Sequence, residues 1–391
     1  MDRAYQIILY GATGFTGRLC AEYLRDNYPD IKWAIAGRNK QKLEDLKNLL
    51  RLNCEIFVAD GEDKDSIDHI VCKTKVILST AGPFARYSNL IVKSCVENQT
   101  HYTDITGENH WVKKQMDLYN EEAISKGVRV IPSCGYDSLP SDIGTLFAIN
   151  QINKSVKKVE VFHSASGGAS GGTIESIFSM GKLPKEMRDP FLLNPKESVS
   201  DFQRKKSADS LSIKWIEEAQ KWSGLGLFSV ANTRVVRRSA ALMEMNQKSY
   251  GNNFIYKEYG AYASKNSARI ASIGLILSFL IISTPLKWLI RRFLPQPGEG
   301  PSLEVQNNGW FKGVFVAEAE DGEKQVSTIY GDGDPGYKST SKMLCESALT
   351  IALSDNLPGG EDFGGFLTPA TGLGIPLIER LKKADIKFEV V

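Results

Sequence analysis

The sequence predicts an α/β protein whose N-terminal half is a doubly wound parallel sheet and whose C-terminal half is a second domain. The chain has 391 residues, a length that favours two domains. Up to about residue 150, short apolar runs alternate with stretches in which apolar residues recur at helical spacing. The first of those runs ends in a turn with glycines at 11 and 14, and a third glycine follows at 17 in the next predicted helix. We therefore expect residues 1–150 to form one domain and 151–391 another.

The first element is a strand at 5–10, YQIILY, which ends at a turn beginning with Gly11. A helix follows from residue 15. A strand, a glycine turn and a helix together are the context that supports a dinucleotide fingerprint. Gly11 permits the tight turn, Gly14 lets the backbone approach a pyrophosphate, and Gly17 allows close packing of helix on strand. The spacing is GxxGxxG rather than GxGxxG, so the turn alone is weak evidence. The predicted phosphate-binding residues are Gly11, Thr13, Gly14, Phe15, Thr16 and Gly17.

The second strand, expected at 31–36, leads into Arg38. This position, about 20 residues past the glycine turn, normally meets the adenosine ribose. An acidic residue there accepts hydrogen bonds from the 2′-hydroxyl of NAD, whereas an arginine suits the 2′-phosphate of NADP. Lys40 and Lys42 follow closely. The sequence therefore predicts NADP, with a strand-end arginine that merely faces water as the alternative.

Four more strands are expected at 54–59, 75–80, 102–106 and 128–132, separated by helices. The third strand closes on Asp60, from which a side chain could reach an adenine. The fourth is followed by a loop that should lie across the crevice from the glycine turn. We expect Thr80, Ala81, Gly82 and Pro83 in this loop to contact the cofactor. Six strands with helical crossovers make a complete Rossmann domain.

The sixth strand runs into a polar, turn-rich segment at 133–142, at the edge of the sheet where ligands bind. Tyr136 and Asp137 are its best candidates for catalytic proton transfer. The alternative is structural, with Asp137 capping the next helix, expected at 143–149, and Tyr136 packing. Asp104 and Glu108 are weaker candidates, because carboxylates after a strand more often hold a loop.

The second half is less regular. We expect strands at 156–163, 225–234 and 311–319. A glycine-serine loop at 164–172 precedes a helix expected at 173–180, and this loop could hold a carboxylate or thioester oxygen or act as a spacer.

No charged residue lies between Arg269 and Lys287, so residues 270–286 form an uncharged run of 17 residues, at the lower limit for a membrane-spanning helix. Aromatic and basic residues interleave after it, as in segments that lie at a membrane interface. We expect 270–294 to contact a peripheral membrane or lipid surface, or another copy of the chain. A buried helix and a true membrane span are the alternatives.

Composition excludes other classes. The apolar fraction is 42% and the net charge is +2, whereas a nucleic-acid binder would usually carry a strongly basic domain. The six cysteines are scattered and predict reduced thiols in the cytoplasm. The first strand begins too early for a signal peptide. The four histidines lack metal-ligand spacing, so no metal is expected. The only Tyr-xxx-Lys pair is Tyr28 with Lys32, at a turn, which excludes short-chain dehydrogenase chemistry.

Motifs along almost the whole chain resemble the saccharopine dehydrogenase-like oxidoreductases, a family that includes the trans-acting enoyl reductases of lipid synthesis. They are YGATGFTG at 10–17, AGR at 36–38, STAGPF at 79–84, YTDITGE at 102–108, PSCGYDSLPSD at 132–142, GGASGGT at 167–173, LPQPGEGPS at 294–302 and FLTPATGLGIPLIERLKKADIKF at 366–388. The resemblance implies a Rossmann domain, a second α+β domain built on a mixed sheet, and a nicotinamide cofactor. We also expect residues 360–391 to pack back on the first domain, and a homo-oligomer.

The resulting hypothesis is an NADP(H)-dependent oxidoreductase that reduces a C=C or C=N bond in a hydrophobic or carrier-linked, lipid-type substrate. It would be cytoplasmic or membrane-associated. One alternative is a non-catalytic nucleotide-binding scaffold at membranes or lipid droplets. Another is an amino-acid dehydrogenase, which needs arginines for substrate carboxylates. Arg234, Arg237 and Arg238 are the only cluster in the second domain, and their expected position at the end of a strand predicts a surface.

Overall fold

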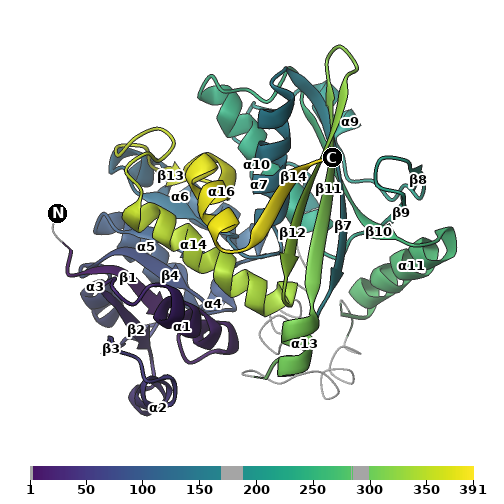
Figure 1. Ribbon diagram of the computed structural model, residues 1–391. Helices are drawn as coiled ribbons and strands as arrows, with labels where there is room; N and C mark the ends of the chain where they lie inside the picture. Colours follow the sequence, from purple (N-terminus) through teal and green to yellow (C-terminus); the bar gives the residue numbers. More distant parts are fainter. Residues whose placement is uncertain (1–2, 169–187, 283, 285–298) are drawn as a thin grey trace.

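The computed structural model describes residues 3–168, 188–282, 284 and 299–391. In this part of the chain two seven-stranded sheets lie beside each other, with helices between and around them (Figure 1). The predicted helix at 173–180 and most of the segment 283–294 lie outside the described residues.

The first sheet is parallel throughout and has the order β13-β6-β5-β4-β1-β2-β3. Its strands are β1 (Tyr5–Tyr10), β2 (Trp33–Gly37), β3 (Glu55–Val58), β4 (Thr74–Ser79), β5 (His101–Asp104), β6 (Arg129–Ile131) and β13 (Gly365–Phe366). Its own helices are α1 (Phe15–Asn27), α2 (Lys40–Leu50), α3 (Lys64–Val71), α4 (Phe84–Tyr87), α5 (Asn89–Glu97) and α6 (Asn109–Ser125). The six strands from the N-terminal half have the Rossmann order, which confirms the predicted fold class.

Local sequence explains where these helices begin. Asn39 accepts a hydrogen bond from the Lys42 N–H and starts α2, whose leucines at 43, 46 and 50 are buried on one face. Asp63 starts α3 in the same way. By contrast, α1 begins at Gly14 with no side-chain cap, so its first N–H groups keep their hydrogen-bonding capacity.

The second sheet has the order β14-β12-β11-β7-β10-β9-β8 and is mixed, as predicted, because β7 and β10 are parallel whereas the other pairs are antiparallel. Its strands are β7 (Val156–Ser166), β8 (Trp215–Ile216), β9 (Lys221–Gly224), β10 (Ile255–Tyr262), β11 (Trp310–Ala319), β12 (Lys324–Asp332) and β14 (Ile386–Val390). The remaining elements in the described chain are α7 (Leu139–Ile152), α9 (Asp201–Lys206), α10 (Ser229–Met245), α11 (Lys265–Ile282), α13 (Leu303–Asn308), the short π-helix η2 (Pro335–Ser339), α14 (Thr340–Leu353), α15 (Pro369–Gly372) and α16 (Gly374–Lys383).

Helix α7 joins the two halves. It is apolar around most of its circumference and buried over nearly its whole length, as expected for a helix covered on all sides. It packs on β11 and β12 of the second sheet and on α10 and α16. A side chain at Gly144 would lie 2.2 Å from the Phe315 ring, so the glycine permits close packing of helix on sheet.

The end of the chain returns to the first sheet. Helix α14 packs against α1 and covers β1, β4 and β5, as Figure 1 shows in yellow-green. Strand β13 then extends that sheet beside β6, and β14 joins the second sheet beside β12. The buried Glu346 on α14 accepts hydrogen bonds from the Tyr23 and Tyr28 hydroxyls and from Arg380 on α16. The two halves are therefore connected by several chain crossings.

The strand predicted at 225–234 is wrong. Residues 225–228 form a loop, and helix α10 begins at Ser229. The apolar residues favoured a strand when read as far as 234, but Val235, Val236 and Ala240 continue them at helical spacing and are buried. Packing against β10 and α7 outweighs the local β-propensity.

Candidate active site

The glycine turn fits a pyrophosphate. Gly11 has φ +84, and a Cβ there would lie 2.9 Å from the backbone nitrogen of Ala81. A Cβ on Gly17 would lie 2.3 Å from the Gly11 carbonyl oxygen. Both positions therefore require glycine, the first for its conformation and the second for space. At Gly14 a Cβ would meet only the Gly11 carbonyl oxygen, at 3.4 Å, so the outer side of the turn is open.

The start of α1 lies at this open side. Thr13 and Gly14 are exposed and Thr16 is half-buried. The uncapped N–H groups of the first helical turn, together with the positive end of the helix dipole, suit phosphate oxygens. The Phe15 ring has a different role, because it packs edge-on against Tyr337, with ring centroids 5.1 Å apart. Only the backbone of Phe15 thus remains for a ligand.

Arg38 and Asp60 end neighbouring strands, and the structure brings them together around Tyr10 and Tyr87. The Arg38 guanidinium lies 5.7 Å from the centroid of the Tyr87 ring, and that of Arg86 lies 4.9 Å from it. Burial raises the pKa of Tyr10 to about 12, the Asp60 carboxylate adds to this, and Arg38 opposes it. Asp60 itself accepts a hydrogen bond from the Glu62 N–H and shapes the turn. Arg86 and Tyr87 were not predicted, although they come two and three residues after the STAGPF motif.

The loop after β4 closes the other side of the crevice. The Thr80 hydroxyl lies within hydrogen-bonding distance of the carbonyl oxygens of Tyr10 and Gly11, at 3.2 and 3.1 Å. Ala81, Gly82 and Pro83 follow it and lead into α4. The buried Glu108 accepts hydrogen bonds from the N–H groups of Phe84 and Ala85, at 2.9 and 3.1 Å. Glu108 therefore fixes the loop.

Asp104 also holds backbone. Its carboxylate accepts hydrogen bonds from the N–H groups of Thr106 and Ser133 and from the Tyr102 hydroxyl. Burial raises the pKa of Asp104 to about 7, although the hydrogen bonds oppose this shift. The loops after β5 and β6 are thus joined through one carboxylate, which leaves Asp104 a structural role.

Asp137 is different, because no hydrogen bond or ion pair to its carboxylate is present among residues 3–168, 188–282, 284 and 299–391. It follows β6 at the ligand-binding edge and is only partly buried. Burial alone raises its pKa to about 7. It does not cap α7, whose N-terminus has no side-chain cap. A carboxyl group with a pKa near neutrality and no partner is suited to exchange a proton with a ligand.

Tyr136 lies beside it in an aromatic wall. Its ring centroid is 5.2 Å from that of Phe311 and 6.4 Å from that of Phe228. Its hydroxyl makes no hydrogen bond with the described part of the chain. Burial raises the pKa of Tyr136 well above its usual value, and Glu258 and Asp137 add to the shift. The wall is apolar and is shared by the two domains.

A polar network behind this wall was not predicted. The Ser138 hydroxyl donates to Asn232 at 3.1 Å, and Asn232 donates to Glu258 at 2.7 Å. The Tyr256 hydroxyl donates to the other oxygen of Glu258, also at 2.7 Å. These residues come from the turn before α7, from α10 and from β10, so the network fixes the segment that carries Asp137. Its members are far apart in the sequence and share no motif.

His163 extends the network. Its Nε2 lies 2.9 Å from the Ser141 hydroxyl and 3.9 Å from Glu258. Burial lowers the pKa of His163, although Glu258 opposes the shift, so the ring is neutral near pH 7. Its Nδ1 is buried without a hydrogen-bonding partner in the described chain.

Comparisons with known proteins agree with this geometry. The family model described as the saccharopine dehydrogenase NADP-binding domain matches residues 7–131. A protein of Mycobacterium tuberculosis, provisionally named a trans-acting enoyl reductase, is 31% identical, and the match covers 99% of this chain and 97% of that protein. This chain belongs to the saccharopine dehydrogenase-like oxidoreductases. A trans-acting enoyl reductase of Mycobacterium leprae is 30% identical over 98% of this chain and 97% of its own.

Among solved structures, the saccharopine dehydrogenase (L-Glu forming) of Saccharomyces cerevisiae aligns with a TM-score of 0.56 and 13% identity, covering 99% of this chain and 100% of that one. This likeness supports the fold. The matched domain makes NADP the cofactor of this oxidoreductase. Arg38, together with Arg86 near the same Tyr87 ring, supplies the positive charge that a 2′-phosphate requires.

We expect Arg38→Asp to reverse the preference of this oxidoreductase for NADPH over NADH. A guanidinium–phosphate contact contributes on the order of 1.5–3 kcal/mol, or roughly ten- to a hundred-fold in affinity. Lys75→Asp is the matched control, because it makes the same charge change at an exposed position at the start of β4, away from the ligand edge. Titration of both cofactors by fluorescence measures the effect. Equal affinity of the unmodified protein for NADPH and NADH would contradict the assignment.

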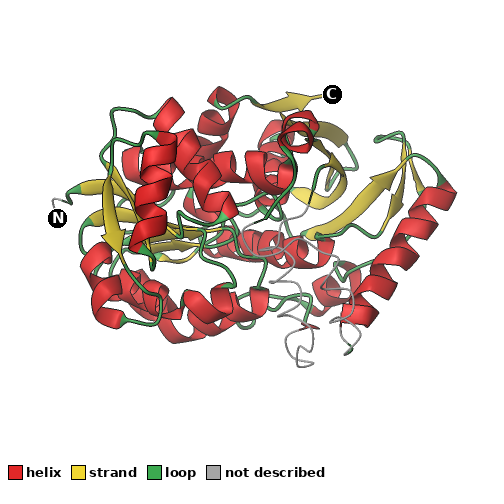
Figure 2. Cartoon of the chain, turned by 90° about the horizontal axis from the view of Figure 1, so that it is seen from below, coloured by secondary structure: helices red, strands yellow, loops and turns green. Residues whose placement is uncertain are grey.

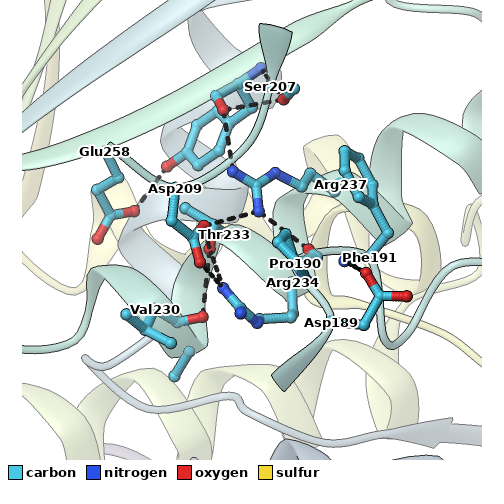
Figure 3. A network of polar contacts seen from close by, with 12 residues as sticks. Asp189, Pro190, Phe191, Ser207, Asp209, Val230, Thr233, Arg234, Arg237 and Glu258 are labelled. Atoms are coloured by element: carbon cyan, nitrogen blue, oxygen red, sulfur yellow. Dashed lines mark hydrogen bonds and ion pairs between the residues drawn. The ribbon is translucent and has the colours of Figure 1, made fainter. Parts of the chain in front are cut away.

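The arginine cluster of α10 is not at a surface, which corrects the prediction. Arg234, Arg237 and Arg238 are 3–5% exposed. Asp209 binds Arg234 at 2.6 Å and Arg237 at 2.9 Å, as Figure 3 shows. Arg238 donates to the carbonyl oxygens of Leu193 and Phe366. These guanidinium groups hold the fold together, and none of them is free to bind a substrate carboxylate.

Proposed function

We propose that this oxidoreductase reduces the C=C bond of an α,β-unsaturated acyl group carried as a thioester. The observation that carries the proposal is Asp137, a partnerless carboxyl group beside an apolar aromatic wall at the ligand edge of a Rossmann sheet. The names of the mycobacterial relatives support an enoyl substrate. A C=N bond in a hydrophobic substrate is the second acceptor that the same groups could serve.

Each group has a separate role in the proposed reaction. Bound NADPH supplies hydride chemistry, which the protein itself lacks. The partly exposed Phe228 would hold the acyl chain by apolar contact, and Tyr136 and Phe311 are buried behind it. Asp137 would give its proton to the carbon next to the carbonyl while the other alkene carbon receives the hydride. The C=C bond becomes a single bond, and solvent returns a proton to the carboxylate.

Asp137 is a better proton donor than Tyr136. General acids work best when their pKa lies near the operating pH. Burial raises the pKa of Asp137 to about 7, whereas that of Tyr136 is moved far above neutrality. We therefore assign proton donation to Asp137 and give Tyr136 a packing role in the apolar wall.

The arrangement favours an acyl substrate over an amino acid. An amino-acid dehydrogenase needs cations for the carboxylates of its substrate, and the arginines of α10 are already bonded to Asp209 and to carbonyl oxygens. A non-catalytic nucleotide-binding scaffold is the remaining alternative. Such a scaffold would not need a carboxyl group whose pKa is raised to about 7 by burial.

The direct assay follows NADPH absorbance with a series of 2-enoyl thioesters of increasing chain length. We expect consumption of NADPH that depends on the double bond and increases with chain length, because the wall is apolar. The matched saturated thioesters should give none. No consumption with any thioester, at cofactor concentrations that saturate binding, would favour the scaffold.

A further inference from the structure

Helix α11 is apolar, and little of the described chain covers it. Mean hydropathy over its 18 residues is 1.4, and 11% of them are buried. By length and composition it is the one helix in the described residues that could cross a membrane. Ile270, Ile273, Leu277 and Leu280 are 72, 58, 52 and 58% exposed. Within the described part of the chain, residues 270–282 are therefore not a buried core helix.

The exposure is not confined to one face. No residue from 273 to 282 is buried, and all five from 276 to 280 are exposed. Because an α-helix has about 3.6 residues per turn, five consecutive residues point to every side. Figure 2 shows α11 running along the outer edge of the second sheet, at the right of the view. A second copy of the chain would cover one face, whereas lipid surrounds a helix on all exposed sides.

The base of α11 is attached to the candidate active site. Ser272, one of its two buried residues, accepts a hydrogen bond from the Leu225 N–H at 2.9 Å. The Tyr262 hydroxyl donates to the Leu225 carbonyl oxygen at 2.7 Å. Leu225 begins the loop that ends at Phe228, and Phe228 packs edge-on against Tyr136. One short loop thus connects the exposed helix with the aromatic wall.

This loop and the start of α10 also carry exposed apolar side chains. Leu227 and Val230 are 50% and 47% exposed. Lys265 and Arg269 at the start of α11 are exposed cations, and each basic residue near an anionic membrane adds to its attraction. An apolar surface bordered by cations and leading to an apolar wall suits a lipid surface that also supplies an acyl substrate.

We propose that α11 inserts into the surface of an anionic lipid bilayer and that the loop at 225–228 couples this docking to the substrate side of the active site. The choice of an acyl substrate rests on the proposed function. Docking itself does not, and it is measured without any reaction. Failure of docking and failure of the enoyl reductase activity are therefore separate results.

Flotation tests docking, with vesicles of equal parts phosphatidylcholine and phosphatidylglycerol. We expect the intact protein to float with the vesicles and Leu277→Glu/Leu280→Glu to lose at least about tenfold in partitioning for each leucine removed from lipid. Leu49→Glu/Leu118→Glu is the matched control, since these leucines are 65% and 66% exposed on α2 and α6. It should float like the intact protein. NADPH binding by all three proteins confirms that they are folded.

Three results would overturn docking by α11. The intact protein could stay at the bottom of the gradient and form a dimer in solution, which would make α11 an interface between copies. The α11 variant could float as well as the intact protein. The control variant could lose flotation equally, which would mean that the added negative charge alone prevents binding to the vesicles. Should the α11 variant not fold, hydrogen exchange at 273–282 in the intact protein decides, because insertion must slow it on addition of vesicles.

Hydrogen exchange also tests the coupling. Vesicles should slow amide exchange at 225–228 at least several-fold in the intact protein. Ser272→Ala removes the acceptor for the Leu225 N–H and should keep flotation while losing that change. Unaltered exchange at 225–228 when the intact protein is bound to vesicles would contradict the coupling.

Discussion

Asp137→Asn should lower kcat for the enoyl thioester by about 10²–10⁴-fold, because a positioned general acid contributes rate of that size. Affinity for NADPH should stay nearly constant, since Asp137 follows β6 and the glycine turn follows β1, with β5 and β4 between these strands. Asparagine has nearly the same shape, and no hydrogen bond within the described chain is lost. Steady-state kinetics with a fixed thioester and a parallel NADPH titration measure both quantities.

The pH dependence of kcat follows from Asp137 as well. Burial raises the pKa of Asp137 to about 7, so the proton is present below that pH and lost above it. We therefore expect kcat to be constant below about pH 7 and to fall above it, and Asp137→Asn should abolish this dependence. Tyr136→Phe is the control and should retain most of the activity. Loss of activity in Tyr136→Phe with normal turnover in Asp137→Asn would exchange the two roles.

Asp209→Ala should destabilise the fold by about 3–5 kcal/mol, because it leaves two buried guanidinium groups without their counter-ion. The side chains of Arg234 and Arg237 are 5% and 2% exposed, whereas that of Asp209 is 33% exposed. Figure 3 shows the carboxylate between them. Burial acts to raise the pKa of Asp209, but the two arginines hold it below its usual value. The loss should therefore be present at neutral pH and shrink as pH falls through this lowered pKa.

Urea unfolding at neutral pH measures the effect, with Asp117→Ala as the control. Asp117 pairs with Lys113 on the exposed side of α6, and such pairs typically contribute about 0.3–0.5 kcal/mol. An Asp209→Ala protein as stable as the control would mean that water or other groups solvate the arginines, and the cluster would again be a candidate for substrate binding.

Much of the first sheet could be predicted, because each strand is a short apolar run between turn residues. The glycine turn, Arg38 and the loop after β4 follow from their order along the chain. Strand β13 could not be predicted, since it has two residues and joins β6 from the other end of the sequence. Helix α10 was misread because its β-branched residues favour a strand until packing is known.

The sequence predicts where the site lies, but not which of its carboxyl groups is available for proton transfer. The order of strands places Tyr136 and Asp137 at the ligand edge, yet only the fold shows that Asp104 is fully hydrogen-bonded and Asp137 is not. Glu258 and His163 come from separate strands of the second sheet, with no spacing that would connect them. Burial of the α10 arginines depends on Asp209, which no local pattern associates with them.

Isotope transfer tests the central claim most directly. NADPH deuterated at the reactive C4 position is incubated with a 2-enoyl thioester, and the product is analysed by mass spectrometry. We expect a saturated acyl chain with one deuterium at the carbon farther from the carbonyl and one solvent hydrogen at the nearer carbon. An unlabelled, unreduced thioester after full incubation, across all chain lengths and with NADPH bound, would contradict the assignment of this oxidoreductase as an enoyl reductase.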